Sequence, residues 1–147
     1  MFFTIRRATI PDIPAVASMA GLIWHSAAPE ELASDFACIL NADEAAVFLA
    51  FEDETAWGFA QCGMRHDYVE GTRSSPVGYL EGIFVKPEYR SRGCARALLS
   101  ACEDWAREKG CTEFASDCEL TNAESLSFHR NVGFREANRI ICFTKIL

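Results

Sequence analysis

The 147-residue sequence has no apolar run close to the roughly 20 residues that a membrane-spanning helix requires. Its first residues, MFFTIRRATI, contain a charged pair but lack the apolar block and cleavage site of a secretory signal peptide. Basic residues are outnumbered, since 14 Lys and Arg stand against 21 Asp and Glu, and the formal net charge is -7. Because nucleic acids and anionic membranes bind basic surfaces, we expect neither as a partner and expect a cytoplasmic protein.

Disulfide and metal-site patterns are missing as well. The seven cysteines are an odd number, and no two of them have the CxxC spacing. The three histidines, His25, His66 and His129, do not alternate with cysteines in the order typical of zinc sites. We therefore expect reduced cysteines that act as small apolar side chains, and no structural metal.

Half of the residues are hydrophobic, and no linker, repeat or low-complexity segment divides the chain, so we expect one domain over 1–147. Apolar alternation and turn residues predict strands in 2–8, 77–85 and 111–117, two antiparallel strands in 45–68, and one or two strands in 135–147. Apolar periodicity and proline positions predict helices in 9–24, 28–40, 92–109 and 121–132. This order predicts a mixed α/β or α+β domain.

The stretch EYRSRGCARALL, residues 88–99, places two arginines and a glycine before a long amphipathic helix. A helix N-terminus presents unpaired N–H groups and a partial positive charge, and Gly93 leaves the backbone open to close approach. Arg90 and Arg92 add charge beside these donors. The stretch indicates a phosphate site, although an ordinary turn with two surface arginines is the alternative. It matches neither the Walker pattern nor GxGxxG.

Glu81 interrupts the otherwise apolar strand VGYLEGIFV. An unpaired carboxylate is costly in such a strand, so Glu81 either has a structural partner or faces a functional site. Asp117 ends the short strand at ASD, where capping of the next helix is an alternative role. Trp24 and Tyr68 are equally compatible with a packing role.

VKPEYRSRGCARALL resembles motif A of the GCN5-related N-acetyltransferases (GNAT), because Arg90, Gly93 and Ala95 meet the pattern Arg/Gln-x-x-Gly-x-Gly/Ala. NAESLSFHRNVGF, residues 122–134, resembles motif B of that family, a helix that starts at an asparagine and ends in Gly-Phe. The resemblance implies the acyl-CoA N-acyltransferase fold over nearly the whole chain. That fold has a central, mostly antiparallel mixed sheet with flanking helices.

The resemblance also implies acetyl-CoA as cosubstrate. The backbone of Ile83, Phe84 and Val85 would bind pantetheine, and Asn122 would contact the cofactor from the other side. The pyrophosphate would bind the backbone amides of the motif A loop, which are those of Ser91, Arg92, Gly93, Cys94, Ala95 and Arg96. A pyrophosphate at a helix N-terminus and an extended arm on an open strand edge are both physically favourable.

HDYVEGTRSSPVGYLEGIFV and GCTEFASD are similar to the aminoglycoside 6'-N-acetyltransferases, bacterial enzymes that inactivate polycationic antibiotics by acetylating a primary amine. The resemblance implies an antibiotic site lined by Trp24, Tyr68, Glu81 and Asp117, and a homodimer. Carboxylates pair with ammonium groups, and aromatic rings provide flat surface for sugars and for cation–π contacts. The net charge of -7 favours the approach of such a substrate.

For catalysis, Glu81 is the candidate that orients the acceptor amine and accepts its proton directly or through water. His129 stands where many relatives have a tyrosine, and it is either the donor to the departing thiolate or a structural hydrogen-bonding residue. We expect direct transfer in a ternary complex, without an acyl-enzyme on Cys94 or Cys118. Asn138 stands where the aminoglycoside branch often has an acidic residue, which leaves the preferred antibiotics open.

Two other functions fit the same residues. One is a GNAT acetyltransferase whose acceptor is a polyamine, a peptide N-terminus or a lysine, since an acidic protein suits these amines too. The other is a non-catalytic acyl-CoA-binding sensor that keeps the cofactor loop without turnover.

Overall fold

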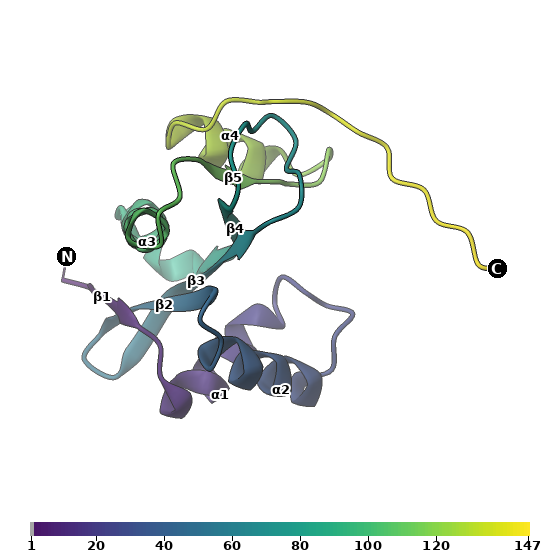
Figure 1. Cartoon of the computed structure of the whole chain (residues 1–147). Helices are drawn as coiled ribbons and strands as arrows, with labels where there is room; N and C mark the ends of the chain where they lie inside the picture. The colour runs from purple at the N-terminus through teal and green to yellow at the C-terminus, as the bar shows by residue number, and fades with distance from the viewer. Residues whose placement is uncertain (1) are drawn as a thin grey trace.

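Five strands form one sheet in the order β1-β2-β3-β4-β5 (Figure 1). The structure is a computed structural model that describes residues 2–147. Neighbouring strands are antiparallel except β4 and β5, which are parallel. The mixed, mostly antiparallel sheet predicted from the sequence is thereby confirmed. The strands are β1 (Thr4–Arg7), β2 (Ala45–Glu52), β3 (Thr55–Arg65), β4 (Val77–Val85) and β5 (Phe114–Ser116).

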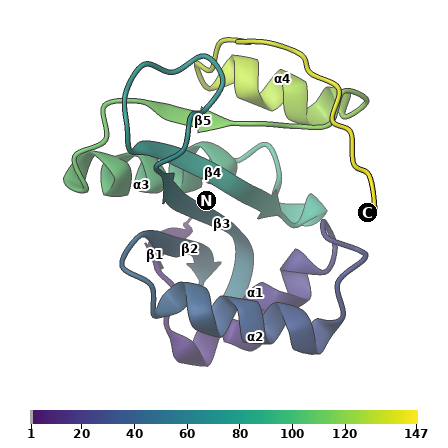
Figure 2. The same ribbon diagram turned by 45° about the vertical axis from the view of Figure 1, so that its right-hand side comes forward.

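Helices cover both faces of the sheet (Figure 2). Helix α3 covers one face and buries Leu98, Leu99, Cys102 and Trp105 against β2, β3 and β4. Helices α1 and α2 cover the other face, where Phe36 packs with residues of β2 and β3. None of the helices in residues 2–147 is long and apolar enough to cross a membrane. The helices are α1 (Ile13–Ala20), α2 (Pro29–Leu40), α3 (Cys94–Glu108) and α4 (Ala123–Asn131), with short 3-10 turns η1 (Ile10–Asp12) and η2 (Pro87–Tyr89).

Two irregularities in β4 shape its middle. Gln61 pairs with Gly82 while the next residue of β3, Cys62, pairs with Leu80, so Glu81 is an extra residue without a partner in the β3 ladder. Such bulges redirect a side chain and are frequent beside active sites. On its other side, β4 pairs with β5 only through Gly78, Tyr79 and Leu80. The second half of β4 therefore has an open edge where β5 leaves it.

The helix predicted for 9–24 is shorter than expected. It divides into η1 and α1, and α1 ends at Ala20. Pro11 and Pro14 stand in the first turns of these two elements, where a missing N–H costs least. Trp24 thus lies in the connection to α2 and not within a helix.

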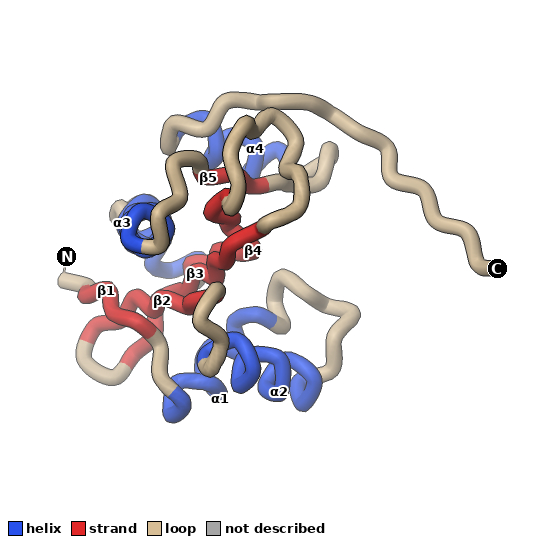
Figure 3. Tube along the Cα trace, in the orientation of Figure 1, coloured by secondary structure: helices blue, strands red, loops and turns tan. Residues whose placement is uncertain are grey.

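The strand or strands predicted in 135–147 are wrong for this structure. The segment has no helix or strand, and Figure 3 shows it running away from the sheet. Its start contacts the β3–β4 loop, where Asn138 donates to Glu70 Oε1 at 3.0 Å. Strand pairing needs a neighbouring edge, and within residues 2–147 the segment pairs with none. Its large apolar side chains are exposed; they are Ile140, Ile141, Phe143, Ile146 and Leu147.

A capping pair fixes the entry into η1, and its removal has a predictable cost. Asp12 accepts from the Thr9 N–H at 2.8 Å and from two nitrogens of Arg6 at 2.6 and 2.8 Å. The Arg6 guanidinium, followed by Thr9, holds the pKa of Asp12 well below its usual range. We expect Asp12→Asn to lower the free energy of unfolding at neutral pH by about 1 kcal/mol, because asparagine keeps an oxygen for the Thr9 N–H but loses the charged pair with Arg6.

The effect of Asp12→Asn should depend on pH. Because the folded-state pKa of Asp12 is depressed, its contribution is present above the unfolded-state pKa of about 4 and is lost as pH falls below it. Urea unfolding at pH 7 and pH 3 should therefore give a smaller difference between the two proteins at pH 3. Asp104→Asn, in an exposed pair with Arg107, is the matched control and should change little at either pH. An equal loss in both variants would contradict a stabilising role of the Arg6–Asp12 pair.

Candidate functional site

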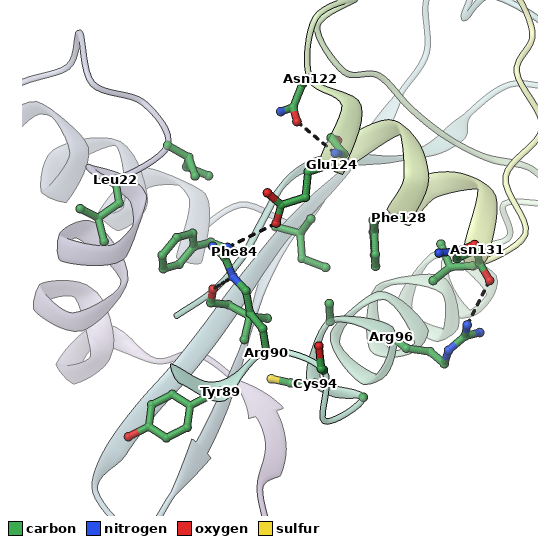
Figure 4. Close-up of a pocket in the computed structure, with 18 residues that line it drawn as sticks. Leu22, Phe84, Tyr89, Arg90, Cys94, Arg96, Asn122, Glu124, Phe128 and Asn131 are labelled. Atoms are coloured by element: carbon green, nitrogen blue, oxygen red, sulfur yellow. Dashed lines mark hydrogen bonds and ion pairs between the residues drawn. The ribbon is translucent and has the colours of Figure 1, made fainter. Parts of the chain in front are cut away.

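A cleft of about 510 Å³ lies at the open edge of β4 (Figure 4). One wall is β4 itself, and another is the segment from Tyr89 to the first turn of α3. Helix α4 forms a further wall through Ser125, Phe128 and Val132. The cleft therefore has one extended-strand wall and one helix N-terminus.

The first turn of α3 is built to accept an anion. Gly93 is its N-cap and has a φ of 82°, and Ser91 also has a positive φ of 63°. Helical bonding begins with Ala97 N–H donating to Gly93 O at 3.0 Å, so the three N–H groups between them have no partner within the helix. Alternating left-handed residues of this kind form anion-binding concavities. A Cβ built on Gly93 meets nothing within 4 Å, so the space in front of this turn is open.

Two arginines beside the cleft, Arg90 and Arg96, form hydrogen bonds with its walls. Arg90 donates from Nε to the Val85 carbonyl at 2.8 Å and from Nη1 to Glu124 at 3.3 Å. Arg96 donates to the Asn131 carbonyl at 3.0 Å, which connects α3 with α4 (Figure 4). These bonds fix the walls of the cleft relative to one another. They also use the Val85 carbonyl, which leaves fewer free backbone groups on β4.

The residues predicted to bind the cofactor converge on this cleft with one exception. Arg92 does not line it, because its guanidinium lies 5.4 Å from the Trp57 ring centroid and 5.8 Å from that of Tyr89. The predicted role of Arg92 concerned its backbone amide, which lies directly before Gly93, the N-cap of α3, and so outside the helix. The predicted residues that line the cleft are Ile83, Phe84, Val85, Ser91, Gly93, Cys94, Ala95, Arg96 and Asn122.

Asn122 has a structural task as well as a place in the cleft. It is the N-cap of α4, and its Oδ1 accepts from the Ser125 N–H at 3.0 Å. This also removes the alternative role of Asp117, since the residue that caps α4 is Asn122. The side-chain amide nitrogen of Asn122 takes no part in this cap.

Glu81 is held by a partner that the sequence analysis missed. Arg65, the last residue of β3, donates from Nε to Glu81 Oε2 at 3.1 Å and from Nη2 to Oε1 at 2.8 Å. The side chains are 43% and 30% exposed, so the pair is accessible from solvent. Opposite charges near each other on neighbouring strands are the available sequence signal, but using it requires the register of β3 and β4.

Tyr79 extends this pair to Asp117. The Arg65 guanidinium carbon lies 3.4 Å from the centroid of the Tyr79 ring, and the Tyr79 hydroxyl donates to Asp117 Oδ2. Burial, followed by the hydrogen bond to Asp117, raises the pKa of Tyr79, so the phenol stays protonated. The structure thus connects the two predicted substrate carboxylates, Glu81 and Asp117, through Arg65 and Tyr79.

Trp24 lies against β4 next to Glu81. A Cβ on Gly82 would come within 2.6 Å of two ring atoms of Trp24, so the absence of a side chain at 82 is what admits the indole. The ring also packs near Phe59, with centroids 6.3 Å apart, and borders a second cavity of about 360 Å³. Tyr68 stands apart on the β3–β4 loop, 75% exposed, and its hydroxyl accepts from the Gly71 N–H at 3.3 Å.

His129 lies on α4 behind the lining of the cleft. Its Nδ1 is 2.7 Å from the Ser125 carbonyl, which accepts only, so this nitrogen carries a proton. Its Nε2 lies 2.8 Å from Ser116 Oγ, and Ser116 donates weakly to the Leu80 carbonyl at 3.4 Å. The imidazole is therefore connected, through Ser116, to the point where β4 and β5 separate.

The described residues include no cluster of side chains that could bind a metal ion. Across residues 2–147 no group of three or more His, Cys, Asp or Glu side chains is arranged to hold an ion. All seven cysteines are free. The reactive groups near the cleft are therefore carboxylates, the imidazole and the thiol of Cys94.

The Cys94 thiol should be inert at neutral pH. Burial raises its pKa to about 11, so almost no thiolate is present at pH 7.5. We expect iodoacetamide to label the exposed Cys38 and Cys142 in the folded protein while Cys94 stays unmodified, as mapped by mass spectrometry of digests. Cys94→Ala should keep turnover within about threefold of the parent, because the loop acts through its backbone. Loss of activity in this variant would instead indicate an acyl-enzyme on Cys94.

An open edge on β4 beside a helix N-terminus with unpaired N–H groups suits an extended ligand that carries phosphate. Comparisons agree with this class of ligand. Residues 13–134 match the Acetyltransferase (GNAT) family. The chain belongs to the GNAT family, and it is an acetyl-CoA-dependent N-acetyltransferase with acetyl-CoA as its cosubstrate.

Relatives of known name cover almost the whole chain. An aminoglycoside N(6')-acetyltransferase type 1 from Stenotrophomonas maltophilia is 43% identical over 143 residues, which span 95% of this chain and 91% of that protein. The structure of AAC(6')-Iy in complex with the bisubstrate analogue CoA-S-monomethyl-acetylneamine has a TM-score of 0.95 and 38% identity over 100% of both chains. The structure of AAC(6')-Ih from Acinetobacter baumannii has a TM-score of 0.93 and 33% identity, and the match covers 99% of both chains. The resemblance found in the sequence is confirmed.

Proposed function

We propose that the chain transfers the acetyl group of acetyl-CoA to the 6'-amine of aminoglycoside antibiotics and thereby confers resistance to them. The observation that carries the proposal is Glu81, the bulged residue of β4, which lies two residues before the cleft-lining Ile83 and directly before Gly82, against which Trp24 packs. The named relatives support the acceptor, because they are aminoglycoside N(6')-acetyltransferases at about the same length as this chain. We further propose that 1–147 acts as one domain in the cytoplasm.

The cosubstrate would bind with its pyrophosphate at the N-terminus of α3 and its pantetheine arm along Ile83, Phe84 and Val85. Unpaired N–H groups and the helix dipole favour the phosphates. The open edge of β4 supplies backbone partners for the amides of the arm, and Asn122 adds its side-chain amide from α4. This arrangement leaves the thioester near Leu80 and Glu81, where β4 and β5 part.

The acceptor would bind beside it, on the side of Trp24. Glu81 and Asp117 supply negative charge for ammonium groups, and the indole supplies a flat apolar face for a sugar ring. Tyr68, exposed on the β3–β4 loop, is proposed as a second aromatic contact. A polycation can pair with several carboxylates at once and is therefore attracted to the site more strongly than a monoamine.

In the chemical step, Glu81 would accept the proton of the amine directly or through a water molecule as the nitrogen attacks the thioester. His129 is the proposed proton donor to the departing thiolate. We propose that His129 acts as an imidazolium, because its Nδ1 proton is held by the Ser125 carbonyl. Its Nε2 then gives its proton to Ser116 Oγ, 2.8 Å away, as the Ser116 hydroxyl passes its own proton to the thiolate, which leaves a neutral imidazole. Transfer is direct, within a ternary complex.

We also propose a homodimer assembled through the C-terminal segment 140–147. Its exposed apolar side chains form a surface that water disfavours, and β5 is a sheet edge to which an extended segment of a second copy can add. Light scattering should give a dimer mass for the full chain and a monomer mass for the variant Ile141→Lys with Phe143→Lys. Lys145→Glu in the same segment is the control. A monomeric full chain would contradict the proposal.

The acceptor is tested by measuring acetyl-CoA turnover as release of free thiol. Kanamycin, tobramycin and amikacin are compared with an aminoglycoside that has a 6'-hydroxyl, with spermidine and with a lysine peptide. Reactions without acceptor correct for the protein's own seven cysteines. Turnover of the 6'-amino drugs alone is the expected result.

The other outcomes separate the alternatives. Turnover of spermidine or the peptide alone would keep the enzyme class and replace the acceptor. Calorimetric binding of acetyl-CoA without turnover of any amine would favour a sensor.

A further inference from the structure

Arg65 occupies the space between the two proposed acceptor carboxylates. Its register partner on β4 is Val77, yet its side chain reaches Glu81, four residues further along that strand. It spans this distance by lying across the Tyr79 ring, 3.4 Å from the centroid. The guanidinium is therefore fixed at three points, the ring face and both oxygens of Glu81.

The arrangement gives little reason to expect a purely structural role. Both side chains are partly exposed, at 43% for Arg65 and 30% for Glu81, and ion pairs of this kind contribute little to stability. The bond from Tyr79 to Asp117 adds a second carboxylate to the same group of side chains. The Tyr79 ring and the two hydrogen bonds to Glu81 fix the orientation of the Arg65 guanidinium. A fixed orientation matters more for catalysis than for folding.

We propose that Arg65 is a positioning residue for acetyl transfer, which orients the Glu81 carboxylate toward the acceptor amine. This rests on the proposed role of Glu81 as the group that receives the amine's proton. A carboxylate has about four acceptor positions, and the Arg65 fork uses one on each oxygen. One further position on each oxygen is free for the amine or for a water molecule.

The charge of Arg65 has an opposite effect on substrate binding. A guanidinium beside Glu81 offsets one of the two negative charges that attract a polycation. Arg65 thus weakens the attraction of the site for ammonium groups while it fixes the geometry of the group that reacts with one of them. Positioning and binding therefore predict different kinetic effects when Arg65 is replaced.

The test is steady-state kinetics of Arg65→Met with the amine that the parent enzyme acetylates most rapidly. We expect kcat to fall about 10- to 100-fold, the usual cost of a misaligned catalytic group, while KM for the amine stays equal or decreases. Arg65→Lys keeps the charge without the fork and should recover part of kcat. Arg107→Met, which removes an exposed arginine of α3, should change neither constant.

A double-mutant cycle isolates the connection to Glu81. If Arg65 acts through that carboxylate, Arg65→Met should have almost no further effect on kcat in a Glu81→Gln background. An equal fold-loss in both backgrounds overturns the proposal, as does a raised KM with unchanged kcat. Thermal unfolding and acetyl-CoA affinity show whether Arg65→Met is misfolded. If it is, Tyr79→Leu is used in its place, because it removes the ring on which the Arg65 guanidinium lies and should cause the same loss of kcat.

The outcome for Arg65 is separable from the outcome for the acceptor. If the parent acetylates spermidine or a peptide and no aminoglycoside, the proposed acceptor fails and the Arg65 cycle is measured with that amine. If it acetylates the 6'-amines and Arg65→Met is unimpaired, the acceptor stands and the positioning role fails. An enzyme that turns over no amine overturns both.

Discussion

Glu81→Gln should lower kcat for the acceptor amine by about 100-fold or more and leave the Kd of acetyl-CoA within about twofold of the parent value. The reason is geometric. Glu81 is the bulged residue of β4 and lies two residues before Ile83, the first β4 residue that lines the cofactor cleft. Glutamine keeps the size of the side chain but cannot accept a proton from an ammonium group, so the step that needs a base is lost while the residues that line the cleft are unchanged.

Detection of the released thiol measures kcat, and calorimetric titration with acetyl-CoA measures its Kd. Glu108→Gln, at the end of α3, removes an acidic side chain away from the cleft and serves as the control. Unchanged kcat in Glu81→Gln would remove this residue from the mechanism. A large loss of acetyl-CoA affinity would instead give it a role in holding the cofactor.

Gly93→Val should raise the Kd of acetyl-CoA at least about tenfold, or about 1.4 kcal/mol of binding free energy. The new side chain projects into open space in front of the α3 N-terminus, where the pyrophosphate is proposed to bind. It also forces a β-branched residue into a φ of 82°, which strains the backbone in the free protein. A loss of affinity alone therefore does not separate crowding from strain.

Gly110→Val provides the matched control. Gly110 has a φ of 90°, and a Cβ there also meets nothing within 4 Å, but it lies beyond the other end of α3 and does not line the cleft. Both variants should lose similar thermal stability, and only Gly93→Val should lose acetyl-CoA affinity in calorimetry. Equal affinities in the two variants would contradict the placement of the pyrophosphate.

The sequence was most informative where one local signal determines one element. Pro87 stops β4, Gly110 follows α3, and the apolar stripe of α3 became its buried face. Most of the cleft followed in the same way, because most of its lining residues lie in the two motifs at 85–99 and 122–134, whereas Leu22 and Ile23 come from the connection after α1 and were not predicted. Such features depend on neighbours in the sequence, which a pattern records directly.

Features that depend on strand register could not be predicted from the sequence. The bulge that turns Glu81 out of β4 and the reach of Arg65 along β4 both need the pairing of β3 with β4. Tyr79 was counted with an apolar strand although its hydroxyl bonds Asp117. The segment 135–147 was predicted as strand from its apolar pattern, but a strand also requires a partner, and within the described residues 2–147 it pairs with none.

The three tryptophans lie in unequal surroundings, which makes intrinsic fluorescence a selective reporter. Trp57 and Trp105 are buried, and among the described residues 2–147 their indole nitrogens have no hydrogen-bond partner. Their emission should be blue-shifted and insensitive to external quenchers. Trp24 is half-buried against Gly82, beside Glu81, so acrylamide quenching should act mainly on its longer-wavelength emission. An acceptor that covers this indole should protect it, and acceptor binding can then be titrated without label, cofactor or turnover.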